Sequence, residues 1–463
     1  MSVMPHSRRW IALAVICLAQ FMLILDVTVV NVALPDMAAD LRLDRTTLTW
    51  AVTAYTLCFG GLMLLGGRLA DAFGARRTLL TGLVLFTAAS LVTGLAASAP
   101  LLLGGRMAQG VGAALLSPSA LSLVTTLFHG AERNKALGVW AAIGGTGSAA
   151  GVLLGGALTD GPGWRWIFYV NVPVGLAVLA ALPTLVPASA RRPARLDLPG
   201  ALLVTGGTGA LIYGLVQAGD TGWASRFALL PLIGAAVLYG AFAAVERAGR
   251  APLMDLRMFT RRPVVAGAFL MLIATALLLS AFFLGSVYLQ HVRGYSAFET
   301  GLLFLPVAVG TAFGAHLGSR LVGQLGSRPV AVTGMVLTAV GCVPLARLDG
   351  GTSVYAAVLP GLAVASVGIG AVFVTAMATA LAMVDPHESG LAGGVVNTFH
   401  EVGGSIGVAV VSTVAAAGID RGESGGFADA FTLAAVTAAV GALVALGLVP
   451  RGKPEMTGVA HAH

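Results

Sequence analysis

Apolar residues occur in long, nearly uninterrupted runs from one end of the 463-residue sequence to the other, and short polar segments separate them. Most runs hold about 20 residues, the length that an α-helix needs to cross the hydrocarbon core of a membrane. The pattern predicts fourteen helices, at residues 10–34, 46–66, 78–98, 101–127, 136–159, 166–186, 198–217, 227–245, 264–290, 300–319, 330–346, 354–383, 390–416 and 428–449. Leaving out residues 198–245 gives a twelve-helix alternative.

Composition supports a membrane protein. The chain is 57% hydrophobic and only 10% charged, with a mean hydropathy of +0.90. A soluble protein would carry about 25% charged residues. The predicted fold class is therefore an all-α polytopic membrane protein.

The basic residues predict the orientation of the chain, because cytoplasmic loops of membrane proteins collect Lys and Arg. With the N-terminus in the cytoplasm, nineteen of the 27 Lys and Arg fall on the inner side and seven on the outer side, and Arg106 lies within the membrane. Both termini are then cytoplasmic. This bias also explains the net charge of +7 without a nucleic-acid partner. The great excess of Arg over Lys, with many Ala and Gly, indicates GC-rich coding and hence a bacterial cytoplasmic membrane.

Several classes of function are disfavoured. The three Cys lie in apolar runs and the eight His are dispersed, so we expect no metal site and no clustered catalytic residues of an enzyme. No GxxxxGK[ST] segment and no loop long enough for a nucleotide-binding domain occur, so the chain is not expected to be a self-contained ATP-driven pump. Transport against a gradient would then draw on an ion gradient, with no cofactor.

A short segment is repeated in the two halves of the chain. GRLADAFGARR at 67–77 and SRLVGQLGSRP at 319–329 share an Arg-Leu pair and a Gly-x-Arg, and each separates two predicted helices on the cytoplasmic side. Many secondary transporters consist of two repeated halves that rock about a central site. The repeat predicts such a duplication, with the seventh and eighth helices as an insertion between the halves.

Five motifs now identify a resemblance to the major facilitator superfamily, and within it to the fourteen-helix drug:proton antiporter group. They are GRLADAFGARR at 67–77, LDVTVVNVALP at 25–35, GRMAQGVGAA at 105–114, GTGSAAGVLLGG at 145–156 and WRWIFYVNVPVG at 164–175. The resemblance covers essentially the whole chain. It implies two six-helix bundles, at 1–190 and 263–463, joined by two additional helices within 191–262. It also implies a monomer that exchanges protons for a small-molecule substrate.

The chain departs from the family pattern at two positions. Val152 stands where the antiporter motif has proline, although the glycines of that motif remain for close helix packing: Gly147, Gly151, Gly155 and Gly156. The second copy of the repeated segment has Gly323 where the first has Asp71.

Three ionisable residues within predicted helices are candidates for proton coupling, because charges at membrane depth are costly and mark function by default. Asp26 could bind and release a proton in apolar surroundings, and the resemblance links it to coupling; the alternative is a structural acid. Arg106 keeps its charge and could tune a nearby acid, as the resemblance implies; the alternative is an Arg that reaches the interface. Glu401 shares a helix face with Asn397, which suits proton binding, a cationic substrate or simple packing. His400 should point about 100° away from that face.

The repeated segment predicts a conformational gate. Asp71 would pair with basic residues or a helix N-terminus of the other half, and Gly67 and Gly74 would allow a tight loop. The gate residues are Gly67, Asp71, Gly74, Arg76, Arg77 and Arg328. The same charges also suit a purely topogenic role, and both interpretations can hold together, since topology alone would not need an Asp there.

Aromatic and polar residues on several predicted helices are candidates to line a substrate cavity. They are Asn31, Trp50, Tyr55, Gln109, Tyr288, Asn397 and His400. A cavity with aromatic faces and few polar groups suits lipophilic or cationic compounds better than sugars. The sequence therefore predicts proton-coupled export of drugs or antibiotics by alternating access. The alternative is export of one physiological metabolite, such as an amino acid, a siderophore or a self-made antibiotic.

Overall fold

The computed structural model describes residues 6–128, 130–187, 197–249, 256–349, 351–382 and 389–452. Its regular elements in these ranges are all helices, and each of the fourteen predicted segments coincides with helix. Within the part of the chain that the structure describes, ten helices are long and apolar enough to cross a membrane by length and composition. The all-helical membrane class is confirmed, whereas fourteen crossings stay a prediction.

Contacts divide the chain into two compact units. The N-terminal unit comprises Met1–Thr205 with Ala248–Leu253 and Ser296–Leu302, and the C-terminal unit comprises the remainder. The predicted boundary at 190/191 lies outside the described residues. The three-part division at 1–190, 191–262 and 263–463 stays a prediction.

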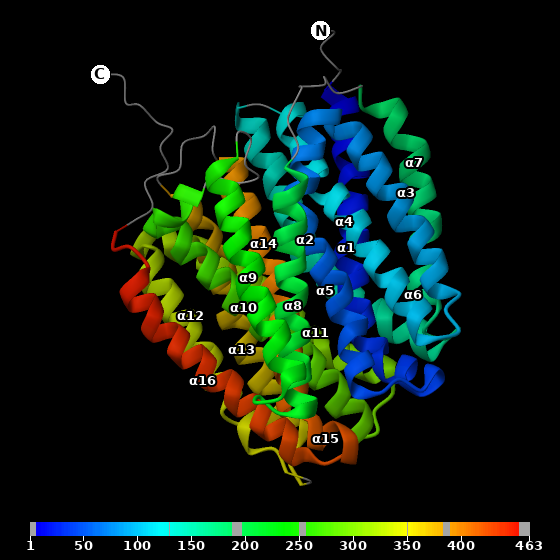
Figure 1. Cartoon of the computed structure of the whole chain (residues 1–463), viewed down its shortest axis with the longest axis vertical. Coiled ribbons are helices and arrows are strands. Elements are labelled where there is room, and N and C mark those ends of the chain that lie inside the picture. Colours follow the sequence, from blue (N-terminus) through cyan, green and yellow to red (C-terminus); the bar gives the residue numbers. More distant parts are fainter. Residues whose placement is uncertain are drawn as a thin grey trace. The chain divides into compact units, whose positions relative to one another are not determined.

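The N-terminal unit contains the helices α1 to α7, which follow one another in the chain (Figure 1), together with parts of two later helices. The first seven are α1 (His6–Leu41), α2 (Arg45–Phe73), α3 (Ala75–Gly94), α4 (Ala99–Leu127), α5 (Gly130–Asp160), α6 (Trp166–Tyr169) and α7 (Asn171–Leu185). α4 packs against both α2 and α3, and α1 packs against α5 and α7. The apolar faces that meet include Leu13, Phe86 and Leu116, which are fully buried.

The C-terminal unit repeats this construction. Its helices are α9 (Arg226–Ala248), α10 (Arg262–Val287), α12 (Ser327–Cys342), α13 (Leu359–Leu381), α14 (Ser389–Val414), α15 (Ala416–Arg421) and α16 (Ser424–Leu448). α8 (Leu198–Thr221) and α11 (Ala297–Leu325) are divided between the units. α10 packs against α13 and α14, and α12 packs against α13 and α16. Short turns of 3-10 or π helix lie at 256–260, 288–292, 345–347 and 354–358.

The two copies of the repeated segment fold alike. Gly74 ends α2 with a φ of 94°, and Gly326 lies between α11 and α12 with a φ of 88°. A side chain strongly disfavours this left-handed region, so glycine is required at both turns. The expectation that Gly67 also turns the loop is wrong. α2 continues past Gly67 to Phe73, because Arg68 and Asp71 end the apolar run without interrupting the helical hydrogen bonds.

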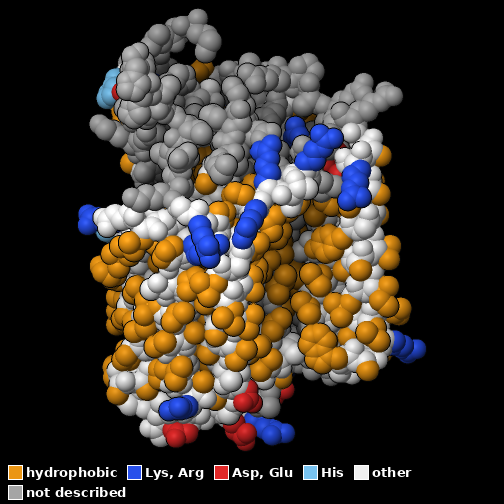
Figure 2. All heavy atoms as spheres, turned by 90° about the vertical axis from the view of Figure 1, so that its left-hand side faces the viewer, with side chains coloured by type: hydrophobic (Ala, Val, Ile, Leu, Met, Phe, Trp, Pro, Cys, Tyr) orange, Lys and Arg blue, Asp and Glu red, His pale blue; other side chains and the backbone are white. Residues whose placement is uncertain are grey.

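The outer surface of the C-terminal unit fits contact with lipid. Figure 2 shows apolar side chains over the broad middle of this face and charged side chains gathered toward its two ends. On α16, Val436, Val440 and Leu443 follow helical spacing and are exposed, Leu443 by 68%. An apolar stripe of this kind is favourable against hydrocarbon and costly in water.

Candidate proton-coupling site

A buried ion pair joins Asp26 of α1 to Arg106 of α4. The distance from Arg106 Nη1 to Asp26 Oδ2 is 2.5 Å, and each side chain is only 1% exposed. Arg106 therefore does not reach the membrane interface, which was the alternative that its sequence position left open. The structure brings together two of the three predicted coupling residues.

The guanidinium group of Arg106 has further partners that fix its direction. Nε donates to the carbonyl of Ala51 at 3.0 Å, and Nη1 also donates to Gln109 Oε1 at 3.1 Å. The ring of Tyr55 lies 4.4 Å from the guanidinium carbon, close enough for a cation–π contact. Tyr55 and Gln109, both predicted to line a substrate cavity, instead support the ion pair.

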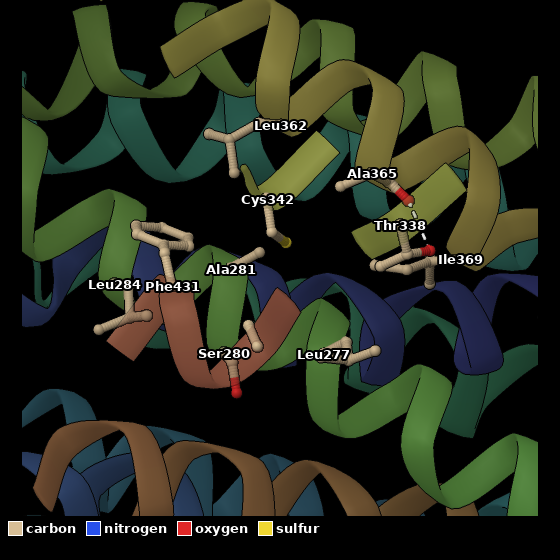
Figure 3. Close-up of a pocket in the computed structure, with 11 residues that line it drawn as sticks. Leu277, Ser280, Ala281, Leu284, Thr338, Cys342, Leu362, Ala365, Ile369 and Phe431 are labelled. Atoms are coloured by element: carbon tan, nitrogen blue, oxygen red, sulfur yellow. Dashed lines mark hydrogen bonds between the residues drawn. The ribbon is translucent and has the colours of Figure 1, made fainter. Parts of the chain in front are cut away.

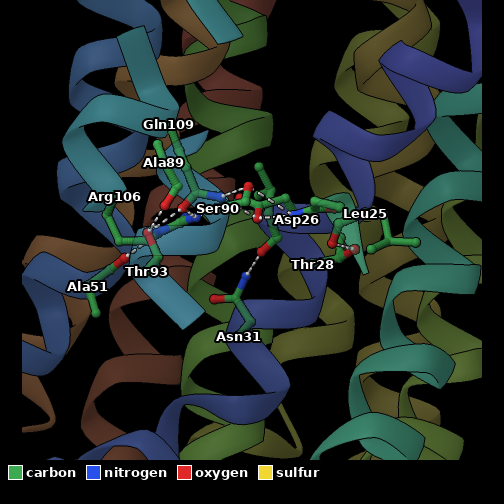
Figure 4. Close-up of polar contacts among 12 residues, drawn as sticks. Leu25, Asp26, Thr28, Asn31, Ala51, Ala89, Ser90, Thr93, Arg106 and Gln109 are labelled. Atoms are coloured by element: carbon green, nitrogen blue, oxygen red, sulfur yellow. Dashed lines mark hydrogen bonds and ion pairs between the residues drawn. The ribbon is translucent and has the colours of Figure 1, made fainter. Parts of the chain in front are cut away.

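The other oxygen of Asp26 lies in a cradle of two side-chain amides, one of which belongs to Gln109, labelled in Figure 4. Gln109 Nε2 donates to Asp26 Oδ1 at 2.9 Å, and Asn171 Nδ2 donates to the same oxygen at 3.1 Å. Ser90 Oγ accepts from the same two nitrogens, at 2.9 and 3.4 Å. Asp26 thus receives hydrogen bonds from α4 and α7, and these donors stabilise its charge.

Ser90 and Asn171 were not predicted as site residues. Asn171 lies inside WRWIFYVNVPVG, and an amide in an apolar segment was a signal that could have identified it. Ser90 gave no such signal, because a single hydroxyl in a helix can bond to its own backbone.

Other residues of the segment WRWIFYVNVPVG hold α6 and α7 in position by hydrogen bonds. The Trp164 indole and the Arg165 guanidinium both donate to Asp40 Oδ2, at 3.0 and 2.7 Å. The Tyr169 hydroxyl donates to the carbonyl of Gly94 at 2.8 Å. These contacts tie the start of the segment to the ends of α1 and α3. Asn171 is consequently held at the depth of Asp26.

The glycines of the antiporter motif contact two different helices, α1 and α11. A Cβ atom on Gly151 would lie 1.8 Å from Thr28 Oγ1, so α5 approaches α1 too closely there for any side chain. Gly147 and Gly155 also face α1. Gly156 faces the backbone of Ala297 and Phe298 instead, within the part of α11 that belongs to the N-terminal unit. Val152 is fully buried, and α5 runs as one helix without the motif proline.

The predicted gate residues fall in several places. Arg76 is half-buried in the first turn of α3 and Arg77 is exposed. Nothing can be said of the Asp71 side chain, which lies outside the described set. Arg328 Nε donates to the carbonyl of Val449 at 2.7 Å, next to the C-terminus of α16. A cation is favourable at that end of a helix, where the carbonyl groups lack partners.

In the C-terminal unit, Glu401 is 9% exposed and lies beside His400 on α14. The expectation that His400 points away from Glu401 is wrong, since His400 Nε2 is 3.8 Å from Glu401 Oε1. His400 Nδ1 lies 2.7 Å from the hydroxyl of Thr275 on α10. Helical spacing alone sets where the Cβ atoms lie and leaves the side-chain torsions free.

The other cavity candidates are mostly buried in packed helices. Asn31 is fully buried and donates to the carbonyl of Val27 at 2.8 Å. Tyr288 is buried against Phe427, with ring centroids 5.4 Å apart. Trp50 and Asn397 are half-buried.

A small pocket opens in the C-terminal unit between α10, α12, α13 and α16 (Figure 3). Its wall is apolar and includes Leu277, Cys342 and Phe431. Its volume of about 10 Å³ is at most enough for one water molecule. This pocket is therefore too small to hold an organic substrate.

Comparisons with known proteins agree with the fold and the motifs. The chain is 43% identical to the puromycin resistance protein pur8 of Streptomyces alboniger, over 89% of this chain and 82% of that protein. It is 38% identical to the cephamycin export protein CmcT of Amycolatopsis lactamdurans, over 88% of this chain and 85% of that protein. The fold is similar to that of an auto-inhibited POT family peptide transporter, with a TM-score of 0.69 at 17% identity over 97% and 99% of the two chains. The family model for the Major Facilitator Superfamily matches residues 16–408, so this multi-pass membrane chain belongs to that superfamily of transporters and not to a family of enzymes.

Proposed function

We propose that the chain is a proton-coupled antiporter that exports lipophilic or cationic antibiotics by alternating access. The observation that carries the proposal is the fully buried pair of Asp26 and Arg106, held by amides and closed to water. Transport is the activity of the superfamily, and the pair supplies a chemical basis for coupling it to protons.

Coupling follows from the chemistry of the pair. Removing two charges from water is costly, and their attraction offsets that cost only while they stay together. If a conformational change separates them, Asp26 becomes a buried carboxylate without its cation, and binding a proton then neutralises it. Arg106 keeps its charge throughout. Proton binding and the separated conformation therefore favour each other, as coupling requires.

The C-terminal unit offers a second acid. Glu401, His400 and Thr275 form a connected set on α14 and α10. Glu401 would either bind a second proton or attract a cationic substrate. The two roles predict different effects of a neutral residue at position 401 on the export of cationic and of uncharged compounds.

The substrate class comes from the relatives. Three of them are named for puromycin, cephamycin and lincomycin, and another, Stp of Mycobacterium tuberculosis, is named as a multidrug resistance protein. This favours an antibiotic as the cargo, and it keeps the narrower alternative open that the chain exports one compound made by its own host. An amino acid or a siderophore is a less direct fit to those names.

The remaining features of the proposal follow the sequence. The chain would have fourteen membrane crossings, two of them between the six-helix bundles, and both termini in the bacterial cytoplasm. It would act as a monomer with the proton gradient as its energy source.

Growth inhibition tests the proposal. A bacterial host without its own exporters would express the wild type, Asp26→Asn or Asp349→Asn at matched membrane levels. Asp349→Asn is a matched control because it makes the same chemical change in an exposed turn. The panel would hold puromycin, a cephamycin, lincomycin, cationic dyes and neutral lipophilic drugs.

We expect the wild type and Asp349→Asn to confer resistance and Asp26→Asn to lose it. Resistance to one compound alone would select the narrower alternative. Equal resistance from all three proteins would remove Asp26 as the coupling acid, and no resistance at all would count against antibiotic export.

A further inference from the structure

The two oxygens of the Asp26 carboxylate have separate partners. Among the residues that the structure describes, Oδ2 accepts from Arg106, whereas Oδ1 accepts from the two amides of Gln109 and Asn171. The cation and the amides thus do not compete for the same oxygen. Any event that removes Arg106 exposes Oδ2 and leaves Oδ1 bonded.

The two amides differ in what else holds them. Gln109 lies three residues from Arg106 on α4 and accepts from Nη1, so its position depends on Arg106. Asn171 begins α7 and is held through Trp164, Arg165 and Tyr169, whose described hydrogen bonds go to Asp40 at the end of α1 and to the carbonyls of Gly94 and Ala96 at the end of α3. Asn171 therefore has attachments to α1 and α3 that do not pass through Arg106.

An amide can serve either protonation state of a carboxyl group. Its NH₂ donates to a carboxylate oxygen and, like any donor, to the carbonyl oxygen of a protonated acid. Oδ1, with two donors, is the oxygen that remains a carbonyl, because a proton placed there would meet N–H groups. The proton must then bind at Oδ2, the oxygen that Arg106 leaves.

From this arrangement we infer that Asn171 is a positioning residue for proton coupling: it anchors Oδ1 of Asp26 so that Arg106 and the proton exchange at Oδ2. In the exchange, the Nη1–H···Oδ2 hydrogen bond breaks, and an O–H bond forms at Oδ2 with a proton from a hydronium ion of the aqueous phase, which is left as water. Arg106 leaves as an intact guanidinium cation, and the net charge of the pair rises from zero to one. The inference rests on the proposed proton coupling.

Few other groups around Asp26 can titrate. Of the helices packed on α1, α4 brings Arg106, α2 brings the Tyr55 phenol and α6 brings Tyr169, whose hydroxyl bonds to Gly94. α7 has no ionisable residue, and α5 has none between Trp140 and Thr159. A change in the pH response on altering Asn171 would therefore report on the Asp26–Arg106 pair.

The test is an infrared pH titration of the buried carboxyl in purified protein in lipid, assigned by its loss in Asp26→Asn. Asn171→Leu removes the donor at similar size, and Asn171→Ala does so without added bulk if the leucine variant does not fold. Thr208→Val is the control, because it removes a buried hydroxyl that bonds to Tyr239 on α9. Asn171→Gln keeps an amide.

We expect the midpoint of the titration to move upward by about one pH unit, a tenfold change in proton affinity, in Asn171→Leu or Asn171→Ala. The ionised form loses a donor in these variants, so the proton binds more tightly. Thr208→Val should match the wild type, and Asn171→Gln should lie between the two. The pH profile of transport should move in the same direction.

The experiment distinguishes a failure of the role of Asn171 from a failure of proton coupling. If Asp26 titrates in the wild type and its midpoint is unchanged in both donor-lacking variants, the role of Asn171 is overturned and proton coupling stands. If no carboxyl titrates in the wild type and transport does not depend on pH, proton coupling falls and the inference falls with it.

Discussion

Asp26 and Arg106 lie 80 residues apart in the chain, and their side chains meet through Oδ2 and Nη1 with almost no exposure to solvent. The pair joins α1 to α4 within the N-terminal unit, and the cradle around it adds α3 and α7. Four helices thus converge on one carboxylate. The protonation state of that carboxylate is consequently linked to how the four helices pack.

The pair predicts a strong coupling between two substitutions. Asp26→Asn and Arg106→Gln should each lower stability by about 3–5 kcal/mol, because each leaves a buried charge without its partner. The double variant should be more stable than either single variant. Thermal unfolding of the four proteins in detergent measures the cycle, and additive losses would show that the two side chains do not interact.

The ring of Tyr55 should contribute to holding Arg106. Tyr55→Phe keeps the aromatic face at 4.4 Å and should retain stability and transport. Tyr55→Leu removes the cation–π contact and should cost about 0.5–2 kcal/mol beyond the change in packing. If Arg106→Gln is made first, the difference between the phenylalanine and leucine variants should shrink. An unchanged difference would mean that the ring acts through packing alone.

Sequence patterns predicted much of the fold and part of the site. Runs of apolar residues located the long helices, because length and hydropathy suffice where the surrounding solvent is lipid, but they did not locate short helices such as α15. Asp26 and Arg106 stood out because charges are rare in such runs. Their pairing was not predicted, since it depends on how α1 and α4 pack.

The errors have similar physical causes. The end of an apolar run was taken as the end of α2, although backbone hydrogen bonds carry that helix on to Phe73. His400 was placed by helical angle, although its side chain turns toward Glu401. Polar residues that act by bonding to another side chain, such as Ser90, have no signature until their partner is known.

Close packing of α5 on α1 predicts a size limit at Gly151. A Cβ atom there would lie 1.8 Å from Thr28 Oγ1 and 2.9 Å from Thr28 Cβ, so Gly151→Ala should force α5 away from α1. The expected cost is about 1–3 kcal/mol, as for other overpacked cores. Gly234→Ala in α9 is the control, because nothing lies within 4 Å of its added carbon. Comparable melting temperatures for the two variants in detergent would contradict this account.

The second acid, Glu401, predicts that export depends on the charge of the transported compound. If Glu401 attracts cations, Glu401→Gln should weaken export of cationic dyes several-fold and leave neutral lipophilic drugs almost unaffected. If Glu401 instead binds a coupling proton, both kinds of cargo should lose export together. Thr275→Val, which removes the hydroxyl bonded to His400, is a matched probe that leaves the carboxyl group in place. Efflux from preloaded cells, measured across pH with each type of cargo, separates the two roles. Unchanged export of both cargoes by Glu401→Gln would leave the residue a packing role alone.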